Sequence, residues 1–149
     1  MVKILQIAVL SSIFFLSACS DDNAKATTDV PASGINELQI IDVVVGTGKK
    51  TVNNHRAAVH YTGWIYDPSA PDKKGKKFDS SYDRNRPFIF SLGNKNVIQG
   101  WDEGILGMRI GGKRTLIIPP HMGYGDKGAG SSIPPNSTLI FDVELLKAG

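Results

Sequence analysis

Residues 97–108 read V-I-Q-G-W-D-E-G-I-L-G-M, and this stretch breaks the strand-like rhythm of the rest of the chain. Its apolar residues recur at helical spacing: Val97, Trp101, Ile105 and Met108. This spacing predicts one short amphipathic helix over 97–106. The three glycines of the stretch keep that helix short and let another backbone segment approach it closely.

On either side of this segment the sequence predicts short β-strands separated by turn signals. The predicted strands cover 38–45, 57–65, 88–92, 114–118 and 139–146. The last one alternates apolar and acidic residues, which is typical of a half-buried antiparallel strand. A single helix among such strands predicts an α+β fold, with a twisted antiparallel β-sheet wrapped around one short α-helix.

The composition limits the classes of function. A chain of 149 residues, 41% of them apolar, fits one domain with a short extra segment. A formal charge of +3 does not favour nucleic-acid binding through bulk charge. One cysteine excludes an internal disulfide and a cysteine-rich zinc site, and three histidines leave little material for another metal site. We therefore expect no metal and no cofactor.

The N-terminus has the pattern of an export signal. Lys3 precedes an apolar run over 4–16 that is too short to span a bilayer comfortably. The run ends in L-S-A-C at 16–19, which resembles the lipobox of bacterial lipoproteins. This predicts a signal peptide over 1–18 and acyl chains, palmitate among them, on Cys19. The alternatives are an ordinary signal peptide that leaves Cys19 as a free thiol, or a retained transmembrane anchor.

Residues 19–37 are small and polar, which predicts an acylated flexible tether ahead of a domain over 38–149. The tether is too short for a helical dimerisation domain, so we expect a monomer. The lipid anchor would place the protein in a bacterial cell envelope, facing the periplasm or the exterior. The sequence leaves open which membrane holds it.

Several other motifs do not predict chemistry. Residues 107–113 nearly match a phosphate-binding loop, but Arg114 stands where a magnesium-binding hydroxyl is needed. The four lysines around Gly75 are typical of a solvated hairpin tip.

Six motifs remain, and together they closely resemble the FKBP-type peptidyl-prolyl cis–trans isomerases over about residues 38–147. They are V-H-Y-T-G at 59–63, K-K-F-D-S-S at 76–81, D-R-N-R-P-F at 83–88, V-I-Q-G-W-D-E-G at 97–104, G-Y-G at 123–125 and I-P-P-N-S-T-L-I-F-D-V-E-L-L at 133–146.

The resemblance implies an aromatic pocket that binds proline-containing polypeptides and accelerates X–Pro isomerisation. The implied catalytic residues are Tyr61, Asp79, Trp101, Tyr124 and Phe141, with Trp101 as the floor. The implied substrate-binding residues are Phe78, Arg84, Phe88, Val97, Ile98 and Ile133. The Ile98 N–H and Tyr124 would hold substrate carbonyls. Tyr61 and Arg84 would orient Asp79, whose own role, on the twisting carbonyl or in shaping the pocket, stays open.

Two departures from the family pattern bear on ligands. Residues 65–75 are longer than the tight turn of the smallest members, and we expect a surface excursion beside the pocket. Ala129 and Ser132 stand where small members have a histidine and a second isoleucine. These changes leave the affinity for macrolides such as tacrolimus or rapamycin open. The rival functions are a substrate-binding chaperone or adhesion module with little turnover, and a purely structural lipoprotein.

Overall fold

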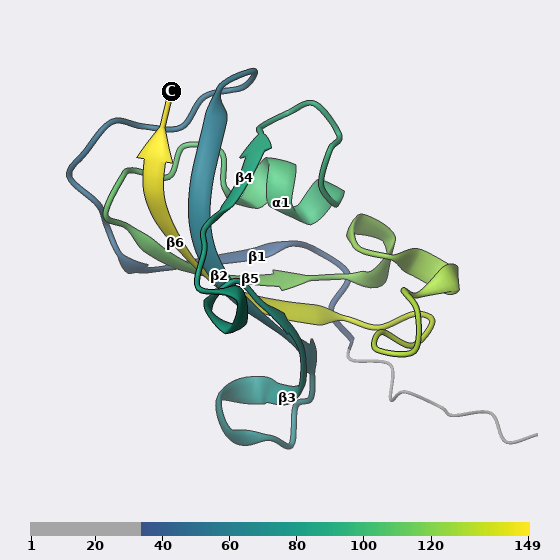
Figure 1. Cartoon of the computed structure of the whole chain (residues 1–149). Helices are drawn as coiled ribbons and strands as arrows, with labels where there is room; N and C mark the ends of the chain where they lie inside the picture. The colour runs from purple at the N-terminus through teal and green to yellow at the C-terminus, as the bar shows by residue number, and fades with distance from the viewer. Residues whose placement is uncertain (1–33) are drawn as a thin grey trace, which may run out of the picture.

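The computed structural model describes residues 34–149, which form an antiparallel sheet curled around one short helix (Figure 1). The strands are β1 (Gln39–Val44), β2 (Arg56–Tyr66), β3 (Lys74–Ser80), β4 (Phe88–Ser91), β5 (Lys113–Ile118) and β6 (Leu139–Ala148). The helix is α1 (Gln99–Gly104), and short 3₁₀ turns lie at Pro71–Lys73, Tyr82–Arg84, Pro120–Met122 and Gly125–Lys127. This confirms the predicted α+β class. The predicted signal peptide, Cys19 and most of the tether lie outside the described residues.

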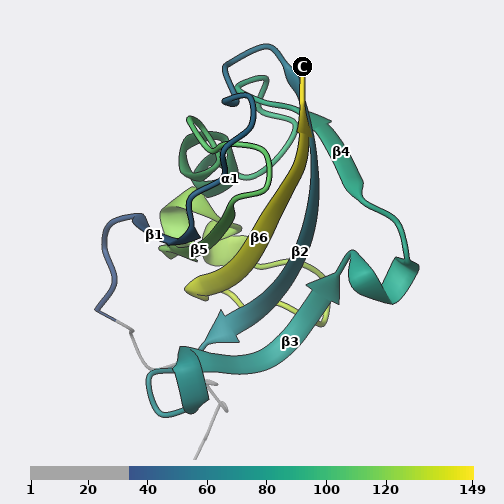
Figure 2. The same ribbon diagram turned by 90° about the vertical axis from the view of Figure 1, so that its left-hand side faces the viewer.

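The strands follow the order β1-β5-β6-β2-β3, and β4 also pairs with β2. All of these pairs are antiparallel. The long strand β2 therefore joins β6 on one side to β3 and β4 on the other, and the sheet bends around the helix (Figure 2). In β2 the residues Val59, Tyr61 and Gly63 are buried while His60 and Thr62 between them are half-buried, as the alternation predicts.

The backbone of the helix packs directly against side chains of β5. A Cβ added to Gly100 would lie 2.5 Å from Ile118 Cγ2, and one added to Gly104 would lie 2.8 Å from the Leu116 methyl groups. Only glycine allows this approach, as the sequence predicts. The helix is shorter than predicted, because Ile98 is extended and serves as its N-cap. The spacing of apolar residues includes Val97 and Ile98 although they are not helical, because their side chains pack against the same core as the helix does.

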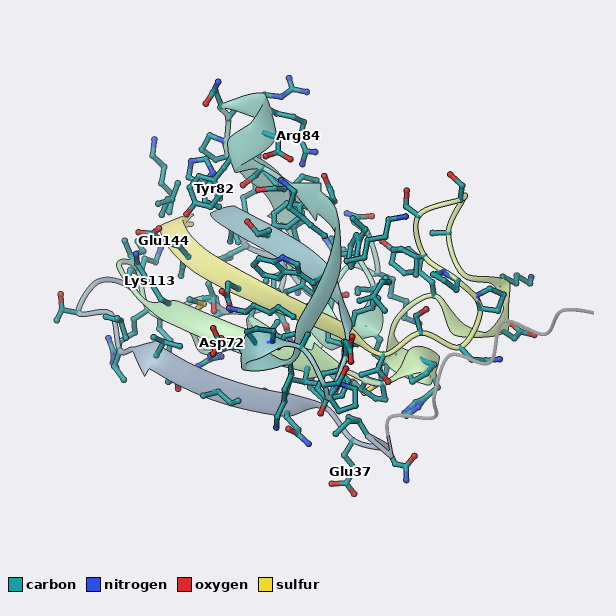
Figure 3. The ribbon with its side chains drawn as sticks, turned by 90° about the horizontal axis from the view of Figure 1, so that it is seen from below. Glu37, Asp72, Tyr82, Arg84, Lys113 and Glu144 are labelled. Atoms are coloured by element: carbon teal, nitrogen blue, oxygen red, sulfur yellow. The ribbon has the colours of Figure 1, made fainter. Side chains whose placement is uncertain are left out.

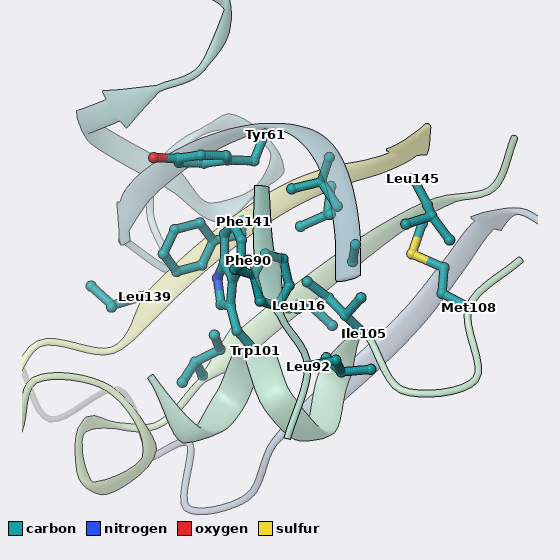
Figure 4. Packing of buried hydrophobic residues seen from close by; sticks show 14 of the residues in the cluster. Tyr61, Phe90, Leu92, Trp101, Ile105, Met108, Leu116, Leu139, Phe141 and Leu145 are labelled. Carbon is teal, nitrogen blue, oxygen red and sulfur yellow. The ribbon is translucent and has the colours of Figure 1, made fainter. Parts of the chain in front are cut away.

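One large core fills the space between the sheet and α1. It contains Trp101 and Ile105 from the helix region and alternate residues of β6, such as Leu139 and Phe141 (Figure 4). A smaller cluster lies on the outer face of the sheet, where Tyr66, Ile117 and Ile140 pack together. Within residues 34–149 no helix is both long and apolar enough to cross a membrane.

The prediction of a solvated hairpin tip for the lysine-rich segment was right in part, since Lys73, Lys76 and Lys77 are exposed near the end of the β2–β3 hairpin. Lys74, Lys76 and Lys77 belong to strand β3, and only Lys73 lies in the turn at the tip. Two irregularities break the pairing of β3 with β2. Lysine is common on such edge strands because its charge stays in water while its stem lies along the sheet. Lys74 differs, since its charge is paired with Asp142, with Nζ 2.6 Å from Oδ2, and lies 4.9 Å from the Trp64 ring centre.

The excursion over 65–75 also lies elsewhere than predicted. None of its residues lines the aromatic pocket described below. Asp72, Lys73 and Lys74 instead border a hollow of about 710 Å³ on the outer face of the sheet, together with Lys113 and Glu144 (Figure 3). The tip of the β2–β3 hairpin thus lies at the outer face of the sheet.

Candidate active site

A pocket of about 160 Å³ opens between the sheet and the segment that enters α1. It is lined by Tyr61, Phe78, Asp79, Phe88, Asn96, Val97, Ile98, Trp101, Tyr124 and Phe141. The structure thus brings together all the residues predicted for the pocket except Arg84 and Ile133. It adds Asn96, which sequence reasoning missed.

Segments far apart in the chain build this pocket. Tyr61 comes from β2, Asp79 from β3 and Phe88 from β4, whereas Trp101 stands on α1 and Tyr124 on the loop after β5. In β3 the neighbours Phe78 and Asp79 both line the pocket, which regular alternation would not allow. They lie at an irregularity in the pairing of β3 with β2, between the pairs Gly63–Asp79 and Trp64–Lys77. The core that supports Trp101 also supports the Tyr61 and Phe141 rings (Figure 4).

Trp101, which the resemblance implies as the floor, lines the pocket and is buried. Only 4% of its surface is exposed. Its ring centre lies 4.9 Å from that of Tyr61 and 5.3 Å from that of Phe141, both nearly perpendicular. Phe88 and Phe90 meet the same indole edge-on at 5.9 Å and 5.6 Å. Such edge-to-face contacts fix the rings against one another, so the pocket has a firm apolar floor.

The indole N–H of Trp101 has no hydrogen-bond partner among the described residues. A buried donor without a partner costs free energy. The indole is instead surrounded by the rings of Tyr61, Phe88, Phe90 and Phe141.

Gly63 makes room for two walls of the pocket. It pairs with Phe141 on β6 and with Asp79 on β3. A Cβ on Gly63 would lie 2.6 Å from Phe141 Cε1 and 2.7 Å from Phe78 Cζ. The two phenyl rings meet edge-on at 5.4 Å in the space that a side chain would fill. The glycine of the V-H-Y-T-G motif is therefore a packing requirement of the pocket.

The polar side of the pocket is a linked set of three side chains. The Tyr61 hydroxyl donates a hydrogen bond to one oxygen of Asp79, and Arg84 forms an ion pair with the other. Arg84 also donates to the Tyr61 oxygen at 2.9 Å. Asp79 is thereby oriented by Tyr61 and Arg84, as the resemblance implies. Arg84 is not a wall of the pocket but holds two of its residues.

These contacts set the protonation states. Burial alone would raise the pKa of the Asp79 carboxyl, but the hydrogen bonds from Arg84 and Tyr61 outweigh burial, and its pKa lies below the ordinary value. Burial, helped by the hydrogen bond to Asp79, raises the pKa of Tyr61 to about 12. Burial and then the charge of Asp79 raise the pKa of Tyr124. At neutral pH the pocket therefore holds a carboxylate and two neutral phenols.

Two donors at the pocket have no partner among the residues that the structure describes. They are the backbone N–H of Ile98 and the hydroxyl of Tyr124, which is 40% exposed at the rim. Both are the groups that the resemblance assigns to substrate carbonyls. Their position leaves them free to donate to a ligand.

Asn96 lies in a loop whose shape depends on α1. Asp102 of the helix accepts hydrogen bonds from the backbone N–H groups of Gly93 at 2.8 Å and Lys95 at 3.1 Å. The next residue, Asn96, reaches the pocket rim with an exposed side chain. Asn96 directly precedes the V-I-Q-G-W motif, and this position was the one feature of the sequence that could have indicated it. Nothing in the residue type itself indicated a place at the pocket.

Ile133 lies in the buried core rather than among the lining residues. Its backbone pairs with Ala129 in both directions, with hydrogen bonds of 2.9 Å and 3.1 Å. The two hydrogen bonds join the ends of the loop over 129–133, in which Ala129 and Ser132 differ from the family pattern. Ile133 therefore supports the outer wall from behind.

The histidines lie apart from the pocket lining. His60 lies on the opposite face of β2, where its Nδ1 is 2.9 Å from Ser81 Oγ and its ring stacks on Tyr82 at 4.4 Å. Within residues 34–149 no group of three histidine, cysteine or acidic side chains could hold a metal ion. The chemistry available to the pocket is the binding of an apolar group, with donors for carbonyl oxygens.

Known proteins are similar to this chain in sequence and in fold. Residues 47–146 match the model of a family described as FKBP-type peptidyl-prolyl cis-trans isomerase. The FK506-binding protein of Neisseria meningitidis serogroup A is 52% identical over 113 residues, which are 76% of this chain and 97% of that protein. FK506-binding protein 2B of Rhizopus delemar is 54% identical over 99 residues, or 66% of this chain, but the match spans only 44% of that longer protein. The crystal structure of AtFKBP13 has a TM-score of 0.66 and 41% identity over 75% of this chain and 93% of that one.

Proposed function

The chain belongs to the FKBP-type peptidyl-prolyl cis–trans isomerases, and we propose that its substrates are X–Pro bonds of exported polypeptides, which it twists in the aromatic pocket described above. The peptidyl-prolyl isomerase activity itself follows from the family.

Catalysis of X–Pro isomerisation has to lower the rotational barrier, while the cis–trans equilibrium stays unchanged. Rotation about a peptide bond meets a barrier of about 18–20 kcal/mol because amide resonance is lost. The cis and trans forms of X–Pro differ by only about 0.5–1 kcal/mol, yet they exchange over tens to hundreds of seconds. An enzyme accelerates this exchange by binding the twisted amide more strongly than either planar form.

The aromatic walls supply that preference. The planar amide has more charge separation than the twisted one, so a pocket with little water disfavours the planar form. Trp101, Tyr61 and Phe141 surround the site with apolar rings, and the proline ring would rest on the indole of Trp101. This aromatic enclosure is the observation that carries the proposal.

The polar groups orient the substrate. The Ile98 N–H and the Tyr124 hydroxyl would donate to carbonyl groups on either side of the rotating bond, which keeps the flanking chain fixed while the amide turns. Since both oxygens of Asp79 are already engaged by Tyr61 and Arg84, we assign Asp79 to positioning the pocket wall. No proton transfer is required.

The cellular setting is also part of the proposal. The sequence L-S-A-C at 16–19 supports cleavage before Cys19, acylation of that residue and attachment to a membrane of the bacterial envelope. Several acyl chains would anchor the protein firmly, since a single chain binds only marginally. The natural clients would then be proline-containing proteins that fold outside the cytoplasm.

Tacrolimus, which is FK506, and rapamycin are the proposed inhibitors. Similar proteins in Neisseria and Rhizopus bear the name FK506-binding protein. The pocket residues around Trp101 support binding here, whereas Ala129 replaces a larger side chain in the outer loop. We expect binding that is weaker than in family members with the histidine and isoleucine.

The deciding experiment measures the isomerisation of a proline tetrapeptide with and without the purified protein. We expect acceleration, greatest with an apolar residue before proline, and inhibition by tacrolimus. Phe141→Leu would keep an apolar side chain of similar position but remove the aromatic wall, and should lower kcat/KM about tenfold. Equal rates with and without protein over a panel of peptides would refute the proposal.

A further inference from the structure

The strand β4 is an edge strand that continues one wall of the pocket. Its four residues pair with Arg56–Val59 of β2, and no other strand among the described residues pairs with it. Figure 2 shows β4 at the margin of the sheet, with its second side uncovered by another strand. Exposed strand edges carry unpaired backbone groups that can bind another chain.

The hydrogen bonds at the end of β4 show which backbone groups are free. Leu92 donates from its N–H to the His55 carbonyl at 3.0 Å and accepts from the Asn54 N–H at 2.8 Å, so both of its groups point to the β2 side. In an antiparallel ladder this orientation alternates along the strand. Phe90 and Phe88 therefore also face β2, and the N–H and carbonyl groups of Ile89 and Ser91 point away from it.

The side chains connect this free edge to the pocket. Phe88 lines the pocket and is 37% exposed, and its ring stacks on Phe90 at 5.6 Å. Ile89, on the other face of the strand, is 53% exposed although it is a large apolar residue. The pocket wall and the free backbone edge are thus successive residues of one strand.

We propose that β4 binds the client polypeptide by strand addition: a segment flanking the bound proline lies extended along the free edge and pairs with the backbone of Ile89. This rests on the proposed function, since it requires an X–Pro bond in the pocket. Backbone pairing does not depend on the client's side chains, so it suits an enzyme that acts on many sequences.

The strand's shortness limits how tightly the segment binds. Pro87 precedes β4 and has no backbone N–H. It therefore cannot donate a further hydrogen bond to a client segment at that end of the strand. A client segment would form only a few hydrogen bonds and would leave readily. The opposite edge strand, β1, has more exposed aliphatic side chains, but none of its residues lines the pocket.

The first test is amide hydrogen exchange of the complete mature protein, read residue by residue by NMR. The ligands are a proline tetrapeptide and a peptide of about twelve residues with the same central four residues. A span of twelve extended residues, about 3.3 Å each, reaches well beyond the pocket. We expect the longer peptide at saturation to slow exchange of the Ile89 amide severalfold, whereas the tetrapeptide does not.

The second test uses Ile89→Pro, which removes the outward N–H without touching a bond to β2, and Ile89→Val as its matched control. The readout is the ratio of kcat/KM for the long peptide to kcat/KM for the tetrapeptide in the same variant. We expect Ile89→Pro to lower this ratio about fivefold and Ile89→Val to keep it.

The two proposals fail separately. Absence of turnover with the tetrapeptide would refute the proposed function, while amide exchange would still report whether the long peptide pairs with β4. Unchanged exchange at Ile89, or an unchanged ratio in a folded Ile89→Pro protein, would overturn strand addition.

Discussion

The hydroxyl of Tyr61 on β2 donates to the carboxylate of Asp79 on β3, and this bond ties together two strands at the polar side of the pocket. Gly63, two residues after Tyr61, is the direct partner of Asp79, so the pair lies on the diagonal of the ladder. Arg84 binds both groups and closes the set. The orientation of an aromatic wall is therefore set by a carboxylate and a guanidinium that do not belong to the apolar surface.

Tyr61→Phe should weaken the pocket without collapsing it. The change removes one donor to Asp79 and one acceptor for Arg84, and we expect a loss of about 1–2 kcal/mol in the free energy of unfolding. The ring would lose its orientation, so kcat/KM should fall about three- to tenfold. Urea unfolding and the tetrapeptide assay measure the two effects.

Tyr66→Phe is the matched control for that variant. Tyr66 is buried in the cluster on the outer face of the sheet, away from the pocket lining. Its replacement should leave kcat/KM unchanged. If both variants lost activity alike, the Tyr61 hydroxyl would have no special role.

Gly63→Ala should damage activity more than its size suggests. The new methyl group would meet both Phe78 and Phe141 at less than 3 Å. The Phe78 and Phe141 rings meet edge-on beside Gly63, and both line the pocket. The methyl group would therefore push them into the pocket. We expect a destabilisation of about 1–3 kcal/mol and a loss of tacrolimus binding, measured by calorimetry. A variant with wild-type affinity would contradict the packing argument.

Activity should be almost flat between about pH 6 and 8. Asp79 has a pKa below its ordinary value, which is about 3.9, and that of Tyr61 is raised to about 12. Neither changes its charge in this range, and the mechanism moves no proton. The pH profile of kcat/KM and a solvent deuterium effect close to one test this, and a steep titration removed by mutating His60 or His121 would require a general acid.

Stability should fall at both extremes of pH. Since the folded pKa of Asp79 is depressed, its contribution is complete above the unfolded value, about 3.9, and is lost as pH falls through the lower folded value. The pKa of Tyr61 is raised in the folded protein, so its contribution is present below about pH 10 and is lost as pH rises through about 12. Thermal unfolding of Asp79→Asn should show a weaker dependence on pH at the acid end.

Trp101 fluorescence should report on tacrolimus. The chain has two tryptophans, and Trp64 lies by the hollow on the outer face of the sheet. In a Trp64→Phe protein the signal belongs to Trp101 alone, and ligand on the indole should change its intensity and shift its emission. No response at a saturating concentration would mean that the loop with Ala129 closes the site to macrolides.

Cys19→Ser should abolish acylation and leave the precursor uncut. Metabolic labelling with palmitate and membrane fractionation follow the two steps. Normal processing of this variant would refute the lipoprotein proposal.

We also expect the mature protein to sediment as a monomer, and a dimer that persists on dilution would contradict this.

The sequence alone determined the class of fold and most of the pocket. Short runs of β-forming residues between turn signals predicted five of the six strands. Alternation was the signal in β2 and β6, because a half-buried strand has to present alternate residues to the core. Helical spacing around Trp101 predicted α1, although the core extends that spacing to Val97 and Ile98, which are not helical. The motifs indicated the aromatic walls through their resemblance to the FKBP family, whereas the aromatic residues taken singly could equally have been core residues.

Only the tertiary structure decided what depends on a distant partner. Strand β3 was missed because a lysine-rich edge strand has no apolar alternation and is held by its pairing with β2. Asn96 reaches the rim because Asp102 fixes the loop before it. Arg84 and Ile133 turned out to support the pocket from outside its lining, since their roles depend on where Asp79 and Ala129 lie in space. Local periodicity follows from neighbours along the chain, whereas these positions follow from contacts between residues that the chain brings together only on folding.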